Sequence, residues 1–527
     1  SLEFEIRFGS DYKKDESIPK LIINQTLYEN VYKKLYSFGF KPSHSGYHMK
    51  IIPTFINKSG RDEKSNVRIE INNLADIELL CKSNLLPDLE NVNFVLKSYH
   101  EEIERPFYNN NYGFRTSIQK ETIISRTSDV VKNITDPSNW NNKKKTFRYI
   151  HRTSLECESM PHIRVDMSIV KSNYNNRQIR FKDSDVINKK PDYEIEIELI
   201  NVNKFSNFNL ITANLKKTIK YILSGIQNTN YPKDLYAINK TLYNYFNLVD
   251  IEKGNQYKSS KNFIGPSSIT LQKVNIIKHE DINNISIQDE FCVTDKADGE
   301  RKLLYISKNG EIYFITVNLD FEYTGLKVES NEIFNTIIHG EHIEKNKFNK
   351  VINYYAAFDI YFCNIKKKSI DVRGLPFYIT NVVDEEDKKK VKYTRYYLLH
   401  KTIKSINNSL KSPGNNNLRI SVKEFKFSKP EKNETIFNCC NRLLTEINSN
   451  SYSYNTDGII FTSKSLGVTQ ESKGDEIKNY KYPWKHSFKW KPPEYNTIDF
   501  LISIKKDKLN KLDIKSKKSK GESIQYY

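Results

Sequence analysis

Short segments in which apolar and charged residues alternate recur through the first 200 residues, and they constrain the fold more than any other feature. Examples are residues 2–8, 67–71 and 193–199. Side chains alternate between the two faces of a strand, so each segment predicts a strand with one apolar and one charged face. A helix over 26–38 interrupts the strands, and helices over 207–225 and 235–247 follow them.

The first and last of these strands carry their acids on one face. The acids on the two strands are Glu3, Glu5, Glu194, Glu196 and Glu198. Adjacent like charges repel, and a divalent cation shared by both strands would remove that penalty. Hard oxygen ligands suit Mg²⁺ or Mn²⁺. The strands between them carry basic residues, namely Arg115, Lys120, Arg148, Arg152 and Arg164.

A closed antiparallel barrel with acids at one side and bases at the other would hold a metal-bound triphosphate. The alternative is an ordinary amphipathic sheet whose charged face meets solvent. The glutamate strands resemble those of the triphosphate tunnel metalloenzyme family, in which such strands bind the metal of an RNA 5′-triphosphatase. The resemblance covers about 1–230, and it departs at Arg7, where the family often has lysine.

The resemblance to tunnel enzymes implies two sets of site residues in the barrel. The implied metal ligands are Glu3, Glu5, Glu194 and Glu196. The implied triphosphate-binding set is Arg115, Lys120, Arg152 and Glu198, the last beside a metal-bound water.

The run Lys-Ala-Asp-Gly-Glu-Arg over 296–301 places a lysine between two β-rich stretches. Four companion segments follow, each on an apolar strand or at its end: 337–341, 356–362, 457–461 and 488–492. Attack on an α-phosphate needs an activated lysine, a metal to neutralise charge, and cations around the transferring group. Taken singly, each segment is also compatible with a turn or a solvated strand face.

This order of segments resembles the covalent nucleotidyltransferase superfamily, which contains RNA capping guanylyltransferases and polynucleotide ligases. The resemblance spans about 265–500 and implies that Lys296 is the nucleophile that forms a lysyl-nucleotide. The implied GTP-binding residues are Arg301, Glu341, Phe358, Asp359, Lys489 and Lys491, with Phe358 stacked on the purine. Asp457 is implied as a metal ligand.

A triphosphatase placed ahead of a guanylyltransferase makes chemical sense, because the first enzyme prepares the diphosphate end that the second caps. The order resembles the multifunctional mRNA capping enzymes of large DNA viruses, including the mimivirus-like group. It implies 5′-triphosphate and 5′-diphosphate RNA as substrates, with GTP, and with a methyltransferase region or subunit and the viral transcription machinery as partners. An ATP-dependent ligase and a non-catalytic RNA-binding subunit are the alternatives.

We therefore expect an α+β protein. The expected parts are a tunnel barrel at 1–230, a helical and polar linker at 231–265, a nucleotidyltransferase domain at 266–498, and the start of a truncated OB-fold with a basic tail at 499–527. The short last part and the initial Ser1 suggest a piece of a longer protein.

The net charge of the 527 residues is +19, which favours a polyanionic partner such as nucleic acid. Abundant lysine, asparagine and isoleucine are also what an A/T-rich genome imposes. Six cysteines without paired spacing predict neither a zinc site nor a disulfide framework, so a reducing compartment is the default. No signal peptide or membrane span is evident, and we expect the host cytoplasm or the virion, with no membrane partner.

Overall fold

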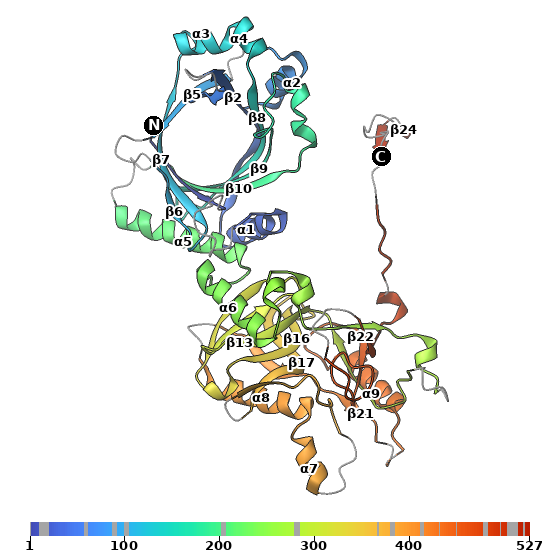
Figure 1. Ribbon diagram of the computed structural model, residues 1–527. Coiled ribbons are helices and arrows are strands. Elements are labelled where there is room, and N and C mark those ends of the chain that lie inside the picture. Colours follow the sequence, from blue (N-terminus) through green and yellow to red (C-terminus); the bar gives the residue numbers. More distant parts are fainter. Residues whose placement is uncertain are drawn as a thin grey trace.

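A computed structural model describes most of the chain, and Figure 1 shows a barrel above a second body of two sheets. The described residues are 2–9, 21–56, 62–86, 92–99, 105–201, 207–278, 285–365, 368–379, 385–411, 416–429, 431, 433–449, 451–477, 483–495, 497–502, 515–519 and 522–526. Helices and antiparallel sheets occur together, so the expected α+β class is confirmed.

Eight strands close the barrel, because β1 pairs with both β10 and β7. Around the ring they are β1 (Leu2–Phe8), β10 (Asp192–Leu199), β9 (Ile163–Ser172), β8 (Lys145–Glu156), β2 (Lys41–Ile56), β4 (Val67–Ile71), β5 (Val92–Tyr99) and β7 (Phe114–Ile123). Two short strands, β3 (Asp62–Lys64) and β6 (Phe107–Asn109), extend β2 and β7. Every neighbouring pair in the ring is antiparallel, as the alternating segments predict.

The apolar core of this part lies outside the barrel wall. Helices α1 (Gln25–Ser37) and α5 (Phe208–Ile226) pack over β1, β9 and β10, where Ile6 and Ile197 are buried. Gly225 allows the two helices to meet, since a Cβ there would lie 2.6 Å from the Cα of Val31. On another side of the wall, α2 (Leu74–Ser83), α3 (Asp129–Thr135) and α4 (Pro137–Asn142) cover a second apolar cluster. The wall is thus held from outside, and its charged faces turn inward.

The segment 231–265 is helical but is not the polar linker that the sequence suggests. Helix α6 (Leu235–Leu248) buries Tyr245 and Phe246 in one core with Phe263 and strands of the second body. The aromatic content of the segment outweighs its polar stretch, because large rings gain most from burial. Short 3₁₀ turns at Lys253–Asn255 and Ser260–Asn262 complete it.

The second body consists of two facing sheets. The five-stranded sheet has the order β11 (Ser267–Thr270), β23 (Pro483–Trp490), β22 (Thr456–Ser463), β12 (Phe291–Ala297) and β21 (Lys426–Phe427). The eight-stranded sheet has the order β18 (Lys368–Asp371), β17 (Val351–Ile365), β16 (Thr336–Lys345), β13 (Glu300–Ile306), β14 (Glu311–Ile315), β15 (Phe321–Val328) and β19 (Leu410–Lys411), and β20 (Arg419–Val422) pairs with β17.

Helices cover the outer faces of these two sheets (Figure 1). Helix α8 (Arg395–Ser409) packs against β17 and β20, and α9 (Ile436–Asn448) packs against β12 and β21. Helix α7 (Glu385–Val391) carries the charged insertion and buries no side chain.

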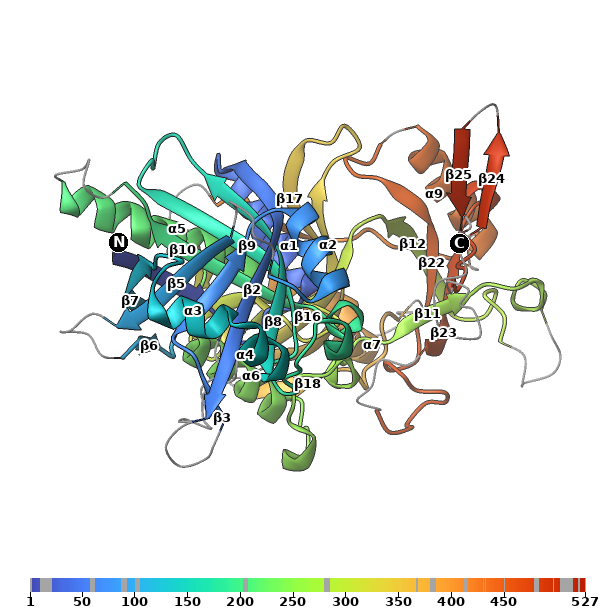
Figure 2. The same ribbon diagram turned by 90° about the horizontal axis from the view of Figure 1, so that it is seen from above.

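Near the chain end, β24 (Lys515–Ser519) and β25 (Glu522–Tyr526) form a hairpin, seen as two red arrows in Figure 2. Most of the expected OB-fold start lies outside the described residues, which include only 499–502 and this hairpin from 499–527. Among the described helices, none combines the length and the apolar character that a membrane crossing requires.

Candidate active sites

The barrel interior collects the acids of the two glutamate strands. The register of β1 and β10 sets Glu5 opposite Glu198 and Arg7 opposite Glu196. The apolar residues between them face outward into the helix-covered core. Glu5, Glu194 and Glu196 are buried although they face the interior, so these carboxylates are shielded from bulk water.

Arginines from two strands, β1 and β8, contact the acids at one end of the interior. Arg148 Nη2 lies 2.9 Å from Glu194 Oε1, and Arg7 pairs with the same carboxylate. Arg152 Nη2 lies 3.5 Å from Glu196 Oε2. The contact of Arg152 with an acid shows that bases and acids are interleaved around the wall rather than segregated on two sides.

Other cations serve the acids toward the opposite end. Lys97 Nζ lies 2.8 Å from Glu3 Oε2 and 3.9 Å from Glu5 Oε2. Arg164 forms an ion pair with Glu198. The sequence pattern does not mark Lys97, because the alternation in β5 is imperfect, with two adjacent buried residues in its middle.

Two of the interior carboxyls have a raised pKa although a cation lies beside each of them. Burial, followed by the charge of Glu196, raises the pKa of Glu5 to about 7. Burial and the charge of Asp166 raise the pKa of Glu198 to about 7 as well. A carboxyl group with such a pKa gains from any added positive charge nearby.

The donor set fits a hard divalent cation in chemistry but is not gathered for one. Within the described ranges, no three His, Cys, Asp or Glu side chains converge as metal ligands do. The cations Arg7 and Lys97 contact the carboxylates instead. The carboxylates of Glu3, Glu5 and Glu196 would hold a metal after local side-chain rearrangement, since all three are oxygen donors on adjacent strands.

One expected triphosphate ligand lies on the wrong face of the wall. Lys120 pairs with Leu2, whereas Gln119 pairs with the inward-facing Glu3. Lys120 is exposed and points away from the interior, so it does not join Arg115 and Arg152 there. A shift of one residue moves a side chain to the opposite face, and the sequence alone did not fix this parity.

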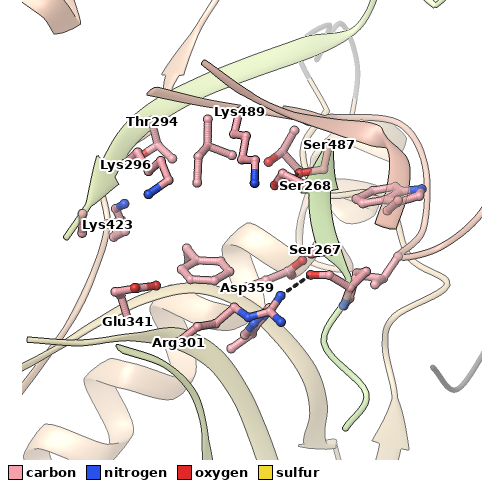
Figure 3. A pocket seen from close by; sticks show the side chains of 18 of the residues that line it. Ser267, Ser268, Thr294, Lys296, Arg301, Glu341, Asp359, Lys423, Ser487 and Lys489 are labelled. Carbon is pink, nitrogen blue, oxygen red and sulfur yellow. Dashed lines mark hydrogen bonds between the residues drawn. The ribbon is translucent and has the colours of Figure 1, made fainter. Parts of the chain in front are cut away.

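The second site is a cavity of about 280 Å³ between the two sheets (Figure 3). Lys296 from β12 and Lys489 from β23 enter from the five-stranded sheet. Arg301 from β13 and Glu341 from β16 enter from the other sheet. The KADGER run therefore crosses from one sheet to the other.

Asp457 joins two of the predicted lysines. Its Oδ1 accepts a hydrogen bond from Lys296 Nζ at 2.6 Å, and its Oδ2 lies 2.7 Å from Lys491 Nζ. Burial acts against ionisation of Asp457, but these two ammonium groups outweigh it and lower its pKa. Gly458 follows with φ +144°, and a Cβ there would lie 2.0 Å from the carbonyl oxygen of Trp490. Glycine therefore permits the close strand pairing that orients Asp457.

The cavity walls offer an aromatic ring and a fixed arginine. Phe358 lines the cavity with its ring centroid 4.4 Å from that of His339. Arg301 donates a hydrogen bond to the carbonyl oxygen of Pro266 at 2.7 Å and lies over Phe263. These contacts hold the guanidinium across the cavity from Lys296 (Figure 3).

Asp359 also lines the cavity, but its side chain is already engaged. Its Oδ1 accepts a hydrogen bond from the fully buried Arg395 at 2.8 Å. Arg395 also donates to the carbonyl oxygens of Leu375 and Leu466. The sequence gave no signal for Arg395, because a lone arginine at the start of a helix is usually exposed.

A third lysine in the cavity was also missed by sequence reasoning. Lys423 lines the cavity beside Lys296, and its Nζ lies 3.1 Å from Asp295 Oδ2. Across the cavity from these lysines, burial raises the pKa of Glu341 to about 7. Neighbouring cations lower this pKa, and Lys423 lowers it the most. Lys423 follows a short strand in an unremarkable Lys-Glu-Phe triplet, so no motif marked it.

The chain is similar to a protein of Acanthamoeba polyphaga mimivirus described as a probable mRNA-capping enzyme. The two are 24% identical over 434 residues, which is 77% of this chain and 34% of that protein. The chain thus spans about a third of the length of this curated relative. No protein-family model matches.

Two solved structures resemble the barrel part at low scores. One is the RNA triphosphatase domain of a trifunctional mimivirus mRNA capping enzyme, at 17% identity and a TM-score of 0.29 over 42% of this chain and 89% of that one. The other is the S. pombe Pct1 RNA triphosphatase, at 14% identity and a TM-score of 0.25 over 42% and 84%.

Proposed function

We propose that the chain performs two consecutive steps of mRNA 5′ capping. The barrel removes the γ-phosphate from 5′-triphosphate RNA, and the cavity around Lys296 transfers GMP from GTP to the resulting diphosphate end. The observation that carries the proposal is the joint presence of both sites in one chain, an acid- and base-lined barrel followed by a lysine-lined cavity. The similarity to a probable capping enzyme over both parts supports it.

In the first step, water attacks the γ-phosphorus and the bond to the β–γ bridging oxygen breaks. Inorganic phosphate and an RNA 5′-diphosphate leave. Arg115, Arg148 and Arg152 bind the triphosphate oxygens, since guanidinium groups match phosphate geometry. A Mg²⁺ or Mn²⁺ ion held by Glu3, Glu5 and Glu196, with Glu194 at their side, would neutralise phosphate charge.

In the second step, the Lys296 ammonium group gives up a proton to solvent, and the resulting amine attacks the α-phosphorus of GTP. A nitrogen–phosphorus bond forms, the α–β phosphoanhydride bond breaks, and pyrophosphate leaves. A β-phosphate oxygen of the RNA then attacks the same phosphorus and releases Lys296. Lys489 and Lys491 offset the charge that develops on the phosphate oxygens, while Arg301 and Phe358 bind ribose and base.

Asp457 and Glu341 have distinct parts in this proposal. Asp457 stays ionised between Lys296 and Lys491 and orients the attacking amine. It is also the acid placed to serve a metal beside the α-phosphate. Glu341 lines the same cavity and has a pKa raised to about 7, and it contacts the ribose or a metal ion there.

The test of the lysine site is labelling with α-labelled GTP and, in a separate reaction, α-labelled ATP. We expect a covalent GMP adduct on Lys296, found by mass measurement of the peptide, and its loss in Lys296→Ala. The exposed turn residue Lys308 provides a matched control, since Lys308→Ala leaves the site intact. Labelling by ATP alone would favour the ligase alternative and reject GMP transfer.

The test of the barrel is phosphate release from 5′-triphosphate RNA with Mg²⁺ or Mn²⁺. We expect the double variant Glu194→Ala with Glu196→Ala to lose release while keeping the lysine adduct. Glu29→Ala, on the exposed face of α1, is the control. Release that survives the double variant would reject the barrel as the triphosphatase.

The remaining parts of the proposal concern partners and setting. A methyltransferase would complete the cap, either as a further region or as a separate subunit, and the viral transcription machinery would deliver the transcript. The host cytoplasm or the virion is the matching location. Co-purification from infected cells tests these associations.

A further inference from the structure

One end of the barrel opens into a cavity of about 470 Å³ that is rich in arginine. Arg7, Arg115 and Arg148 line it together with Tyr174 from the loop after β9. We call this end the arginine mouth. Two acids also line it, namely Glu194, which pairs with Arg7 and Arg148, and Asp192, so the three arginines outnumber the acids by one.

Further acids lie deeper in the interior. Glu5 and Glu198 form a directly opposed pair, and neither lines the arginine mouth. A polyanion that occupies the whole barrel therefore meets three arginines and two acids at the mouth. Around Glu5, by contrast, the three acids Glu3, Glu5 and Glu198 outnumber the two cations Lys97 and Arg164 that pair with them. The two ends of the barrel interior therefore differ in charge, and a polyanion would bind in one preferred orientation.

Tyr174 gives the mouth a feature that a pure phosphate site does not need. The ring is 47% exposed, and Lys64 Nζ lies 3.5 Å from its centroid. Lys64, Arg148 and Arg7 together lower the pKa of its phenol against the opposing effect of burial. The same cavity is lined by the apolar side chains of 21–23, among them the exposed Ile22.

Arginines, an exposed ring and apolar side chains in one cavity match the parts of a nucleotide. Guanidinium groups bind phosphate in a bidentate manner, and tyrosine rings stack on unpaired bases of single-stranded RNA. The cavity volume is within the range of small-ligand pockets, roughly 300–1,000 Å³.

We propose that the arginine mouth is the RNA entrance of the barrel and binds the first nucleotide of the transcript, with its base against Tyr174. This inference rests on the proposed triphosphatase function. In this arrangement the α-phosphate lies among Arg7, Arg115 and Arg148, and the γ-phosphate lies deeper, toward Glu5 and Glu198.

The direct test is photocrosslinking of the full chain to a short 5′-triphosphate RNA with 4-thiouridine as its first nucleotide. The reaction is run with EDTA present, so it does not depend on catalysis. We expect crosslinks to peptides that contain Tyr174 or residues 21–23. Crosslinks to peptides around Arg164 or Lys97 would place the entrance at the other end and overturn the proposal.

A kinetic test separates the nucleotide from the phosphates. Tyr174→Leu should raise the ratio of KM for triphosphate RNA to KM for inorganic tripolyphosphate by about five- to a hundredfold, the usual worth of one stacked base. Tyr174→Phe keeps the ring and should retain most of the wild-type ratio. Tyr47→Leu is the matched control, since Tyr47 is an exposed tyrosine on the outer wall.

The outcomes of these tests distinguish the two proposals. An unchanged ratio in Tyr174→Leu rejects stacking at the mouth even if the wild-type chain releases phosphate from RNA. A wild-type chain that releases no phosphate rejects the triphosphatase proposal, while the crosslink position still decides where the RNA end binds.

Discussion

Removing the buried Arg395 guanidinium behind the cavity that contains Lys296 should lower the free energy of unfolding of the second body. Arg395 is fully buried and binds Asp359 at 2.8 Å and two carbonyl oxygens. Arg395→Met leaves the Asp359 carboxylate buried without its cation. Breaking one side of a buried pair typically costs about 3–5 kcal/mol of unfolding free energy. The carbonyl oxygens of Leu375 and Leu466 lose a donor as well, so we expect the upper part of this range.

Urea unfolding followed by tryptophan fluorescence measures this loss. Two of the three tryptophans, Trp484 and Trp490, lie in the second body, so the signal reports mainly on that part. The double variant Arg395→Met with Asp359→Leu removes both charges and should recover at least half of the lost free energy. A loss below about 1 kcal/mol in Arg395→Met, or no recovery in the double variant, would refute the reasoning.

The ion pair with Arg395 also raises the question whether Asp359 binds GTP directly or only stabilises the fold. Asp359→Asn keeps an acceptor for Arg395 but removes the charge. If Asp359 is mainly a structural partner, this variant lowers the unfolding free energy and leaves the GTP concentration for half-maximal adduct formation within about twofold. A large rise in that concentration with unchanged stability would restore Asp359 as a direct GTP ligand.

Three further predictions concern backbone packing and pH. Gly458→Ala should abolish most adduct formation, because its Cβ would overlap a carbonyl oxygen of β23, whereas Gly474→Ala, at φ +92° in open space, should not. Gly225→Val should lower the Tm of the barrel part by separating α1 from α5, at about 1–3 kcal/mol, while Gly254→Ala should not. The pKa of Glu5 is raised to about 7 in the folded chain, so its contribution to stability is full below about 4.5 and is lost as the pH rises through 7. Glu5→Gln should therefore raise the Tm at pH 8 but not at pH 4.5, and an equal change at both would contradict this assignment.

The strands of the barrel were largely predictable because their alternation has a clear physical cause. Each of the segments 2–8, 67–71 and 193–199 has one apolar and one charged face, and only a closed or covered sheet suits several such strands. The helix boundaries fell within one or two residues, since Asn24 caps α1 with its side chain and Asn207 does the same for α5.

What the sequence left undetermined depends on contacts between distant segments. The face of Lys120 depends on a register that spans more than a hundred residues of chain. Arg395 reaches Asp359 only when α8 packs against β17, and Lys423 enters the cavity only when β20 pairs with β17. The segment 231–265 was expected to be a helical and polar linker, yet the aromatic residues of its helix are buried in the core of the second body.

The apolar contacts that stabilise the barrel lie on the outer face of its wall, so the fold does not require that water be excluded from the interior. Substitutions of charged residues in the interior alter which ligand is preferred but change the free energy of unfolding little, provided that each acid keeps a cation partner. Selection can therefore change the substrate of such a barrel rapidly. Substitutions in the helices that cover the wall, by contrast, are removed by selection most strongly, because they disturb the apolar core. A deep mutational scan scored by the amount of folded protein, rather than by phosphate release, should therefore find that substitutions are tolerated in the barrel interior and not on its helix-covered outer face.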